Sequence, residues 1–76
     1  MLYDYSRLKR RIEIKCGNKS NFAKLIGMPE HLLSHKMNGR TAFTQRDIEA
    51  ASNALQISAK DIPAYFFTFN VQNIEH

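Results

Sequence analysis

The amino-acid sequence predicts an all-α fold. In four successive segments, apolar residues recur at spacings of three and four, which is the period of an amphipathic helix. Good helix N-cap residues precede several of these segments, and a glycine follows each of the first three. With 76 residues, of which 43% are hydrophobic, the chain is long enough for one small domain with its own core.

The first helix is predicted over residues 5–15. Leu8 and Ile12 stand four residues apart and form a narrow apolar stripe among basic residues. Cys16 continues this stripe, so we interpret it as a small buried hydrophobic residue rather than a reactive thiol. Gly17 is a suitable stop for the helix.

The second and third helices are short and closely spaced. Asn18 is the predicted N-cap of the second helix, which runs to Ile26, and Gly27 ends it because glycine readily takes positive φ. Pro29 begins the third helix, which extends to about residue 37. The pair at residues 38–39, Asn-Gly, is a strong turn signal and ends the third helix.

The fourth helix begins with a capping-box pattern, in which Thr44 is the N-cap and Asp47 occupies the position usually held by Glu or Gln. This helix is predicted to continue to about Leu55. Ser58 and Asp61 repeat the pattern, so a short turn of helix is expected to follow them.

The C-terminal segment changes character. Tyr65, Phe67, Phe69 and Val71 stand at alternate positions, which is typical of a short strand, and a second copy of the chain would supply its partner edge. Alternatively, Tyr65 and Phe66 cap the core of their own chain and the rest is an extended tail. We favour the core role and expect a domain over residues 1–67 followed by a tail over residues 68–76.

The net charge of +4 is unevenly distributed. Residues 1–40 hold nine of the eleven basic residues but only three acids. Two interpretations remain open: a face that binds a polyanion, and a basic surface kept for solubility.

Other classes of protein fit the sequence poorly. No apolar run is long enough for a membrane span, and the N-terminal segment has no signal-peptide core. The single cysteine cannot form an intrachain disulfide, so we expect a cytoplasmic protein. Residues that could act as nucleophile, base and orienting group do not occur at helical spacing, and no phosphate-binding glycine motif is present. We therefore expect neither an enzyme nor a cofactor.

Residues 18–38 predict a helix-turn-helix. Ala23 is small and lies where the two helices must approach, Gly27 permits the bend four residues later, and Leu33 faces inward from the second of these helices. These three residues are the predicted structural positions of the motif.

The segments at residues 21–28 (NFAKLIGM) and 33–40 (LSHKMNGR) resemble the helix-turn-helix of phage Cro proteins and repressors. The segments at residues 3–8 (YDYSRL) and 62–68 (IPAYFFT) resemble a narrower group, the small Cro-like or modulator-of-repression (antirepressor) proteins of Gram-positive temperate phages. This resemblance implies a compact five-helix, lambda-repressor-like DNA-binding domain whose third helix meets its partner.

The resemblance also implies site residues. The third-helix residues that would contact DNA bases or a partner protein are Glu30, His31, Leu32, Ser34 and His35. The residues that would contact phosphates are Lys19, Lys36, Asn38, Arg40 and Arg10. His31 and His35 have a spacing that can bind a metal, but the third ligand is missing, so no metal site is predicted.

The sequence and the resemblance leave two alternative functions open. In the first, the protein is a Cro-like repressor of the lysis/lysogeny switch that binds double-stranded operator DNA, as a homodimer if the operator is palindromic. In the second, it is an antirepressor that binds a CI-type phage repressor through the same helix. The basic N-terminal half favours DNA. The third helix favours a protein, because Glu30 and two histidines are not the residues that read bases most strongly.

Overall fold

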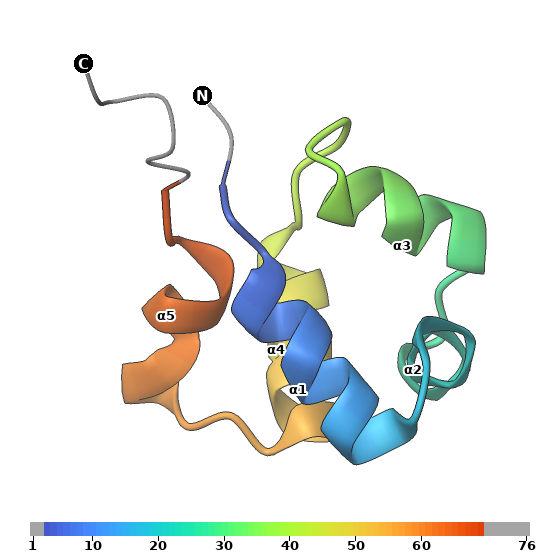
Figure 1. Cartoon of the computed structure of the whole chain (residues 1–76), viewed down its shortest axis with the longest axis horizontal. Helices are drawn as coiled ribbons and strands as arrows, with labels where there is room; N and C mark the ends of the chain where they lie inside the picture. The colour runs from blue at the N-terminus through green and yellow to red at the C-terminus, as the bar shows by residue number, and fades with distance from the viewer. Residues whose placement is uncertain (1–2, 70–76) are drawn as a thin grey trace.

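The computed structural model describes residues 3–69, and the predicted all-α fold is confirmed (Figure 1). The last two elements given below, a 3₁₀ turn and a short α-helix, follow each other without a break and form one C-terminal helical segment. The elements are α1 (Ser6–Cys16), α2 (Lys19–Ile26), α3 (Glu30–Met37), α4 (Gln45–Leu55), the 3₁₀ turn η1 (Ala59–Asp61) and α5 (Ile62–Phe66).

Local capping interactions define the helix starts that the sequence predicts. The Asn18 side chain accepts a hydrogen bond of 2.8 Å from the backbone N–H of Asn21 at the start of α2. At the start of α4, the Thr44 hydroxyl accepts from the N–H of Asp47 and the Asp47 carboxylate accepts from the N–H of Thr44, at 3.0 and 2.9 Å. The capping box at residues 44–47 is therefore confirmed.

The second capping-box pattern behaves differently. The Ser58 hydroxyl donates to the Asp61 carboxylate at 2.9 Å, and it makes no cap to the backbone. The predicted turn of helix nevertheless follows as η1, and α5 continues from it with Pro63 in its first turn. Proline is tolerated there because the first N–H groups of a helix have no partner within the helix.

The core lies where α1 packs against α2, α4 and α5, while α2 also packs against α3 and α4. Cys16 is half-buried against this core, in keeping with its predicted apolar role. The buried apolar side chains are Leu8, Ile12, Phe22, Ala23, Leu33, Ala51, Leu55, Ile57 and Phe66.

The first two residues of the strand considered from the sequence, Tyr65 and Phe66, belong to the helix α5 instead, whereas Phe67 and Thr68 lie outside any helix or strand. α5 includes Phe66, which is only 2% exposed, and Tyr65 packs against the core, so the favoured core role is confirmed. Only Phe69 takes part in extended pairing within the described residues, as one antiparallel bridge to Tyr3 of the same chain. Val71, the last residue of the considered strand, lies outside the described residues.

The two ends of the described chain lie side by side (Figure 1). The backbone N–H of Asp4 donates to the carbonyl of Thr68 at 2.6 Å. The ring of Tyr3 stacks on that of Phe69 and meets Phe67 edge-on. Thr68 and Phe69, which begin the expected tail, therefore contact the N-terminal segment.

Candidate functional site

The turn between α2 and α3 positions the candidate site. Gly27 adopts φ +72°, in the left-handed region that favours glycine, and thereby closes α2. Ala23 in α2 and Leu33 in α3 are both buried in the core, and these two helices pack against each other. The structure thus places the three predicted motif residues in the joint between α2 and α3.

The outward face of α3 carries most of the predicted contact residues. Glu30, His31 and His35 are exposed, whereas Leu32 and Ser34 are half-buried. The two imidazole rings meet edge-on with their centroids 6.2 Å apart. Figure 1 shows α2 and α3 on the side of the molecule opposite α5, and the exposure of Glu30, His31 and His35 leaves the outward face of α3 accessible to a partner.

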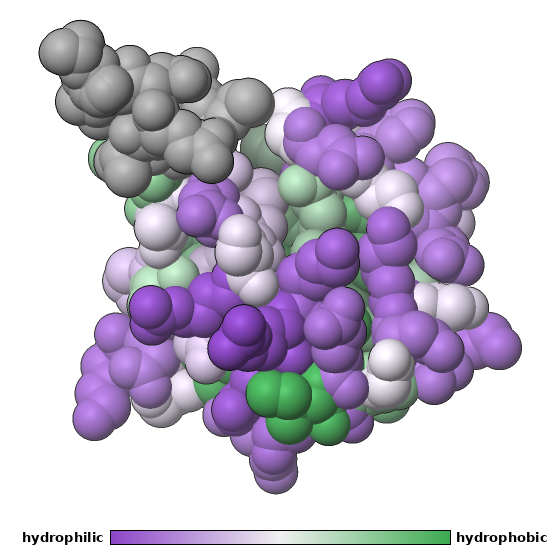
Figure 2. Space-filling model, viewed as in Figure 1, coloured by the Kyte–Doolittle hydropathy of each residue, from purple (hydrophilic) through white to green (hydrophobic). Residues whose placement is uncertain are grey.

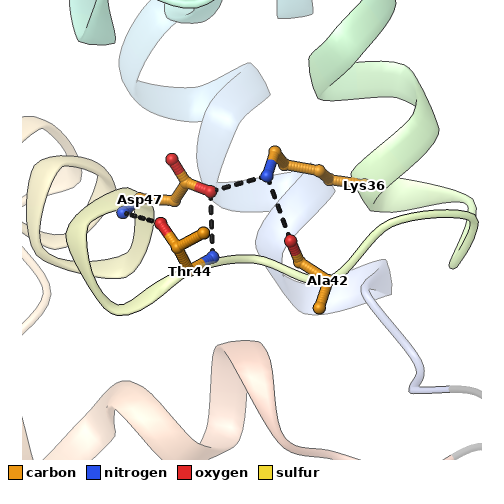
Figure 3. A network of polar contacts seen from close by, with 4 residues as sticks. All are labelled: Lys36, Ala42, Thr44 and Asp47. Atoms are coloured by element: carbon orange, nitrogen blue, oxygen red, sulfur yellow. Dashed lines mark hydrogen bonds and ion pairs between the residues drawn. The ribbon is translucent and has the colours of Figure 1, made fainter.

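Lys36 does not lie on that outward face. It is 5% exposed, and its Nζ lies 2.8 Å from Oδ2 of Asp47 and donates to the carbonyl of Ala42 at 3.0 Å (Figure 3). The expectation that Lys36 contacts phosphate is therefore corrected: its ammonium points into the molecule, because a carboxylate and a carbonyl are available there.

The same network determines the ionisation of Asp47. Burial alone would raise its pKa, but the hydrogen bonds from Lys36 and Thr44 and the positive charge of Lys36 outweigh burial. The pKa of Asp47 is lowered from its ordinary value of 3.8. The carboxylate is therefore ionised at neutral pH and attracts the buried ammonium.

A groove brings together two of the predicted phosphate-contacting residues, Lys19 and Asn38. It lies between the start of α1, the start of α2 and the end of α3, and holds about 430 Å³. Lys9 also lines this groove and is not among the contact residues predicted from the sequence. No local pattern identifies Lys9, because the walls come from three helices. Asp4 and Glu13 line the groove as well, so it is not uniformly basic.

Some basic side chains of residues 1–40 bond to other parts of the chain, and most of the basic side chains in this range are exposed. Arg11 donates to the carbonyls of Leu55 and Gln56 at 3.0 and 3.1 Å, and Lys15 donates to the Gln56 side chain. These two side chains and Lys36 therefore bond to other parts of the same chain. The exposed basic side chains of residues 1–40 are Arg7, Lys9, Arg10, Lys15, Lys24 and Arg40, while Lys19 is half-buried.

The exposed groups produce a largely hydrophilic surface. Figure 2 shows mainly hydrophilic residues across the face that carries α1. Arg10 lines a separate shallow groove with Arg7, so it is not part of the groove that contains Lys19 and Asn38. Arg40 follows α3 in the exposed turn.

Two further findings concern residues 3–69. No helix in this part of the chain is long and apolar enough to cross a membrane. Within the same residues, no three His, Cys, Asp or Glu side chains are grouped so that they could hold a metal ion.

The fold and the site define a small five-helix domain with an exposed third helix. Residues 1–69 match the family described as "Protein of unknown function (DUF739)", and the chain belongs to this family. Its structure is similar to the solution structure of the modulator of repression (MOR) of the temperate bacteriophage TP901-1 from Lactococcus lactis. That match has a TM-score of 0.78 and 40% sequence identity, and it covers 88% of this chain and 90% of the other. No curated protein matches the sequence.

The likeness to phage modulators of repression, which the terminal segments indicate, is thereby confirmed. The resemblance to the wider group of Cro proteins and repressors stays a prediction from the sequence motifs.

Proposed function

We propose that this protein is a modulator of repression that binds a phage repressor in the bacterial cytoplasm and weakens the repressor's hold on operator DNA. The observation that carries the proposal is the 40% identity with the TP901-1 modulator of repression, which extends over 88% of the chain. The proposal needs neither catalysis nor a cofactor, because it requires only an exposed binding surface.

The outward face of α3 is the proposed contact surface. A repressor's DNA-binding surface is basic, since it must meet phosphates. Glu30 offers a carboxylate to such a surface, and His31 and His35 offer imidazoles that donate or accept hydrogen bonds. Arginine, asparagine and glutamine, which read bases most strongly, do not occur among the residues of α3.

A mixing experiment tests this function. A purified CI-type phage repressor is bound to its operator in a gel-shift assay, and this protein is added. We expect the repressor's shift to be lost. Glu30→Lys should abolish the effect, because it places a cation against a basic surface, whereas Glu49→Lys, the same change at an exposed position of α4, should leave it intact. An undiminished repressor shift with the wild-type protein would refute the proposal.

A second candidate function is direct, Cro-like binding of operator DNA. It is favoured by the polar side chains of Lys9, Lys19 and Asn38 in one groove at the end of α3, and by the exposed Arg40. In this case, the basic residues would clamp phosphates and α3 would enter the major groove. Binding to a near-palindromic operator would then require a homodimer.

Fluorescence anisotropy at several salt concentrations tests this second function. Specific binding should exceed binding to random DNA by about 1000-fold. Lys19→Ala should weaken binding to every sequence and reduce the salt slope by about one unit. Lys60→Ala, an exposed lysine in η1, is the matched control and should change neither. Equal affinity for operator and random DNA would exclude the Cro-like function.

A further inference from the structure

The attachment of α3 to the rest of the molecule is sparse. Of its eight residues, only Leu33 and Lys36 are buried. α3 packs against α2, and Leu33 is its buried apolar anchor. Met37, in the last turn of α3, is half-buried and also packs against the core. A binding face must be held to within about half an ångström to work well, and two apolar contacts on one side of a short helix leave its rotation weakly restrained.

Lys36 supplies a polar anchor, and it acts on a different helix. Its Nζ reaches Asp47 in the first turn of α4 and the carbonyl of Ala42 in the segment that joins α3 to α4 (Figure 3). The Asp47 oxygen that meets Lys36 also accepts from the Thr44 N–H. The last turn of α3 is therefore tied to the N-terminal cap of α4.

We propose that Lys36 and Asp47 are positioning residues, whose buried ion pair sets the orientation in which α3 presents its outward face to a macromolecular partner. Leu33 and Lys36 lie three residues apart on the inward side of the helix, whereas His31 and His35 lie outward. Because the helix moves as one body, restraining its inward side orients its outward side. The inference rests on the proposed function only for the identity of the partner.

Stability alone explains this pair poorly. Removing two charges from water is unfavourable, and replacing a buried ion pair by apolar groups of similar size is often neutral or stabilising. The Asp47 side chain is 17% exposed and can recover hydration when its partner is removed. The main effect of such a pair is to favour one relative orientation of the two helices that it joins, here α3 and α4.

The test measures backbone order directly on the full chain. Native-state amide hydrogen exchange is followed by NMR in the wild type, in Lys36→Met and in Lys36→Arg. Methionine keeps most of the side-chain length but loses the charge. We expect amides of residues 34–44 to exchange about tenfold faster in Lys36→Met, relative to amides of α1 and α5. Lys36→Arg should restore slow exchange, since a guanidinium can donate to both acceptors.

Several outcomes would overturn the inference. Exchange that accelerates equally throughout the chain would show that the pair contributes only to global stability. Unchanged exchange in residues 34–44 would show that it does not restrain α3. If Lys36→Met lowers the folded fraction, the double variant Lys36→Met/Asp47→Asn replaces it, because it removes both charges and keeps an amide oxygen for the Thr44 N–H.

A binding measurement links the pair to function. With the CI-type repressor as the probe, Lys36→Met should bind at least about tenfold more weakly, with recovery in Lys36→Arg and no change in the control Lys60→Met. Unaltered affinity in Lys36→Met would refute the positioning role. If the wild type binds neither repressor nor operator DNA, the proposed function fails, whereas the exchange measurement still decides whether the pair restrains α3.

Discussion

At the scale of single residues, the hydrogen-bond acceptors near a basic side chain determine whether it is buried, bonds to another element or stays at the surface. Lys36, Arg11 and Lys19 have the same formal charge. Nevertheless Lys36 is buried against Asp47, Arg11 bonds the end of α4, and Lys19 lines a surface groove. The resemblance to phage regulators implied a phosphate contact for Lys36, which would require its ammonium to lie at the surface. Its partner lies on another helix, and a local pattern cannot reveal such a partner.

Asp47 should make the free energy of unfolding depend on pH in the acidic range. Because the pKa of Asp47 is lowered in the folded protein, its contribution is complete above the ordinary value of 3.8 and is lost as the pH falls below it. Asp47→Asn should reduce the free energy of unfolding by roughly 3 kcal/mol at neutral pH, because removing one partner leaves the buried charge of Lys36 uncompensated, even though the intact pair adds little net stability. The difference between the two proteins should shrink as the pH falls from about 4 toward 2.

Urea denaturation at several pH values measures this difference. Glu49→Gln removes an exposed carboxyl of the same helix and is the matched control. A difference that stays constant down to about pH 2 would contradict the coupling of Asp47 to Lys36.

Ser52 offers a stabilising substitution. Its hydroxyl is buried in α4 and has no hydrogen-bond partner among the residues that the structure describes. Ser52→Ala removes this unfavourable group and improves helix propensity, so it should raise the free energy of unfolding by about 1 kcal/mol. Asn53→Ala, at the exposed neighbouring position, should show the propensity gain alone. A loss of stability in Ser52→Ala would show that the hydroxyl is bonded in solution.

At the scale of elements, helices with local capping signals were predictable, and the C-terminal element was predictable only in part. Asn18, Thr44 and Asp47 satisfy backbone groups a few residues away, so their role is visible in a short stretch of sequence. α5 has only five residues, too few to display a helical period, and its aromatic residues also fit a strand. Packing of Phe66 into the core decides in favour of the helix.

The same contrast applies to the candidate site. The outward face of α3 was predictable because it lies on one continuous helix. The groove that contains Lys9, Lys19 and Asn38 was not, because it requires the relative placement of three helices.

The turn between α2 and α3 should be sensitive to its backbone geometry. Gly27 has φ +72°, and a Cβ there would meet no atom within 4 Å, so a substitution strains the backbone without a clash. Gly27→Ala should therefore reduce the free energy of unfolding by about 1–2 kcal/mol. Gly27→Asn should reduce it less, because asparagine tolerates this conformation better. Equal effects of both variants in urea denaturation would contradict an origin in backbone strain.

At the scale of the whole molecule, stability depends on a small core contributed by all five helices. α5 closes this core through Phe66 and packs against α1, far away in the sequence. A domain of this size has only modest stability in total, so the loss of one large core side chain removes much of it.

Phe66→Ala should reduce the free energy of unfolding by about 3–5 kcal/mol, because it leaves a cavity beneath α1. Phe67→Ala is the matched control, since its side chain is 48% exposed and should contribute far less. Thermal unfolding followed by circular dichroism compares the two. Similar melting temperatures for both variants would show that α5 does not close the core in solution.

The pairing of Tyr3 and Asp4 with Thr68 and Phe69 has a consequence for how the chain is made. The ribosome synthesises the N-terminal segment first. Thr68 and Phe69, with which this segment pairs, become available only after nearly all of residues 3–69 have been synthesised. At about 5–20 residues per second, α1 must therefore wait several seconds with its apolar stripe uncovered by α5. During that interval, the nascent chain is a natural substrate for chaperones that recognise exposed apolar segments.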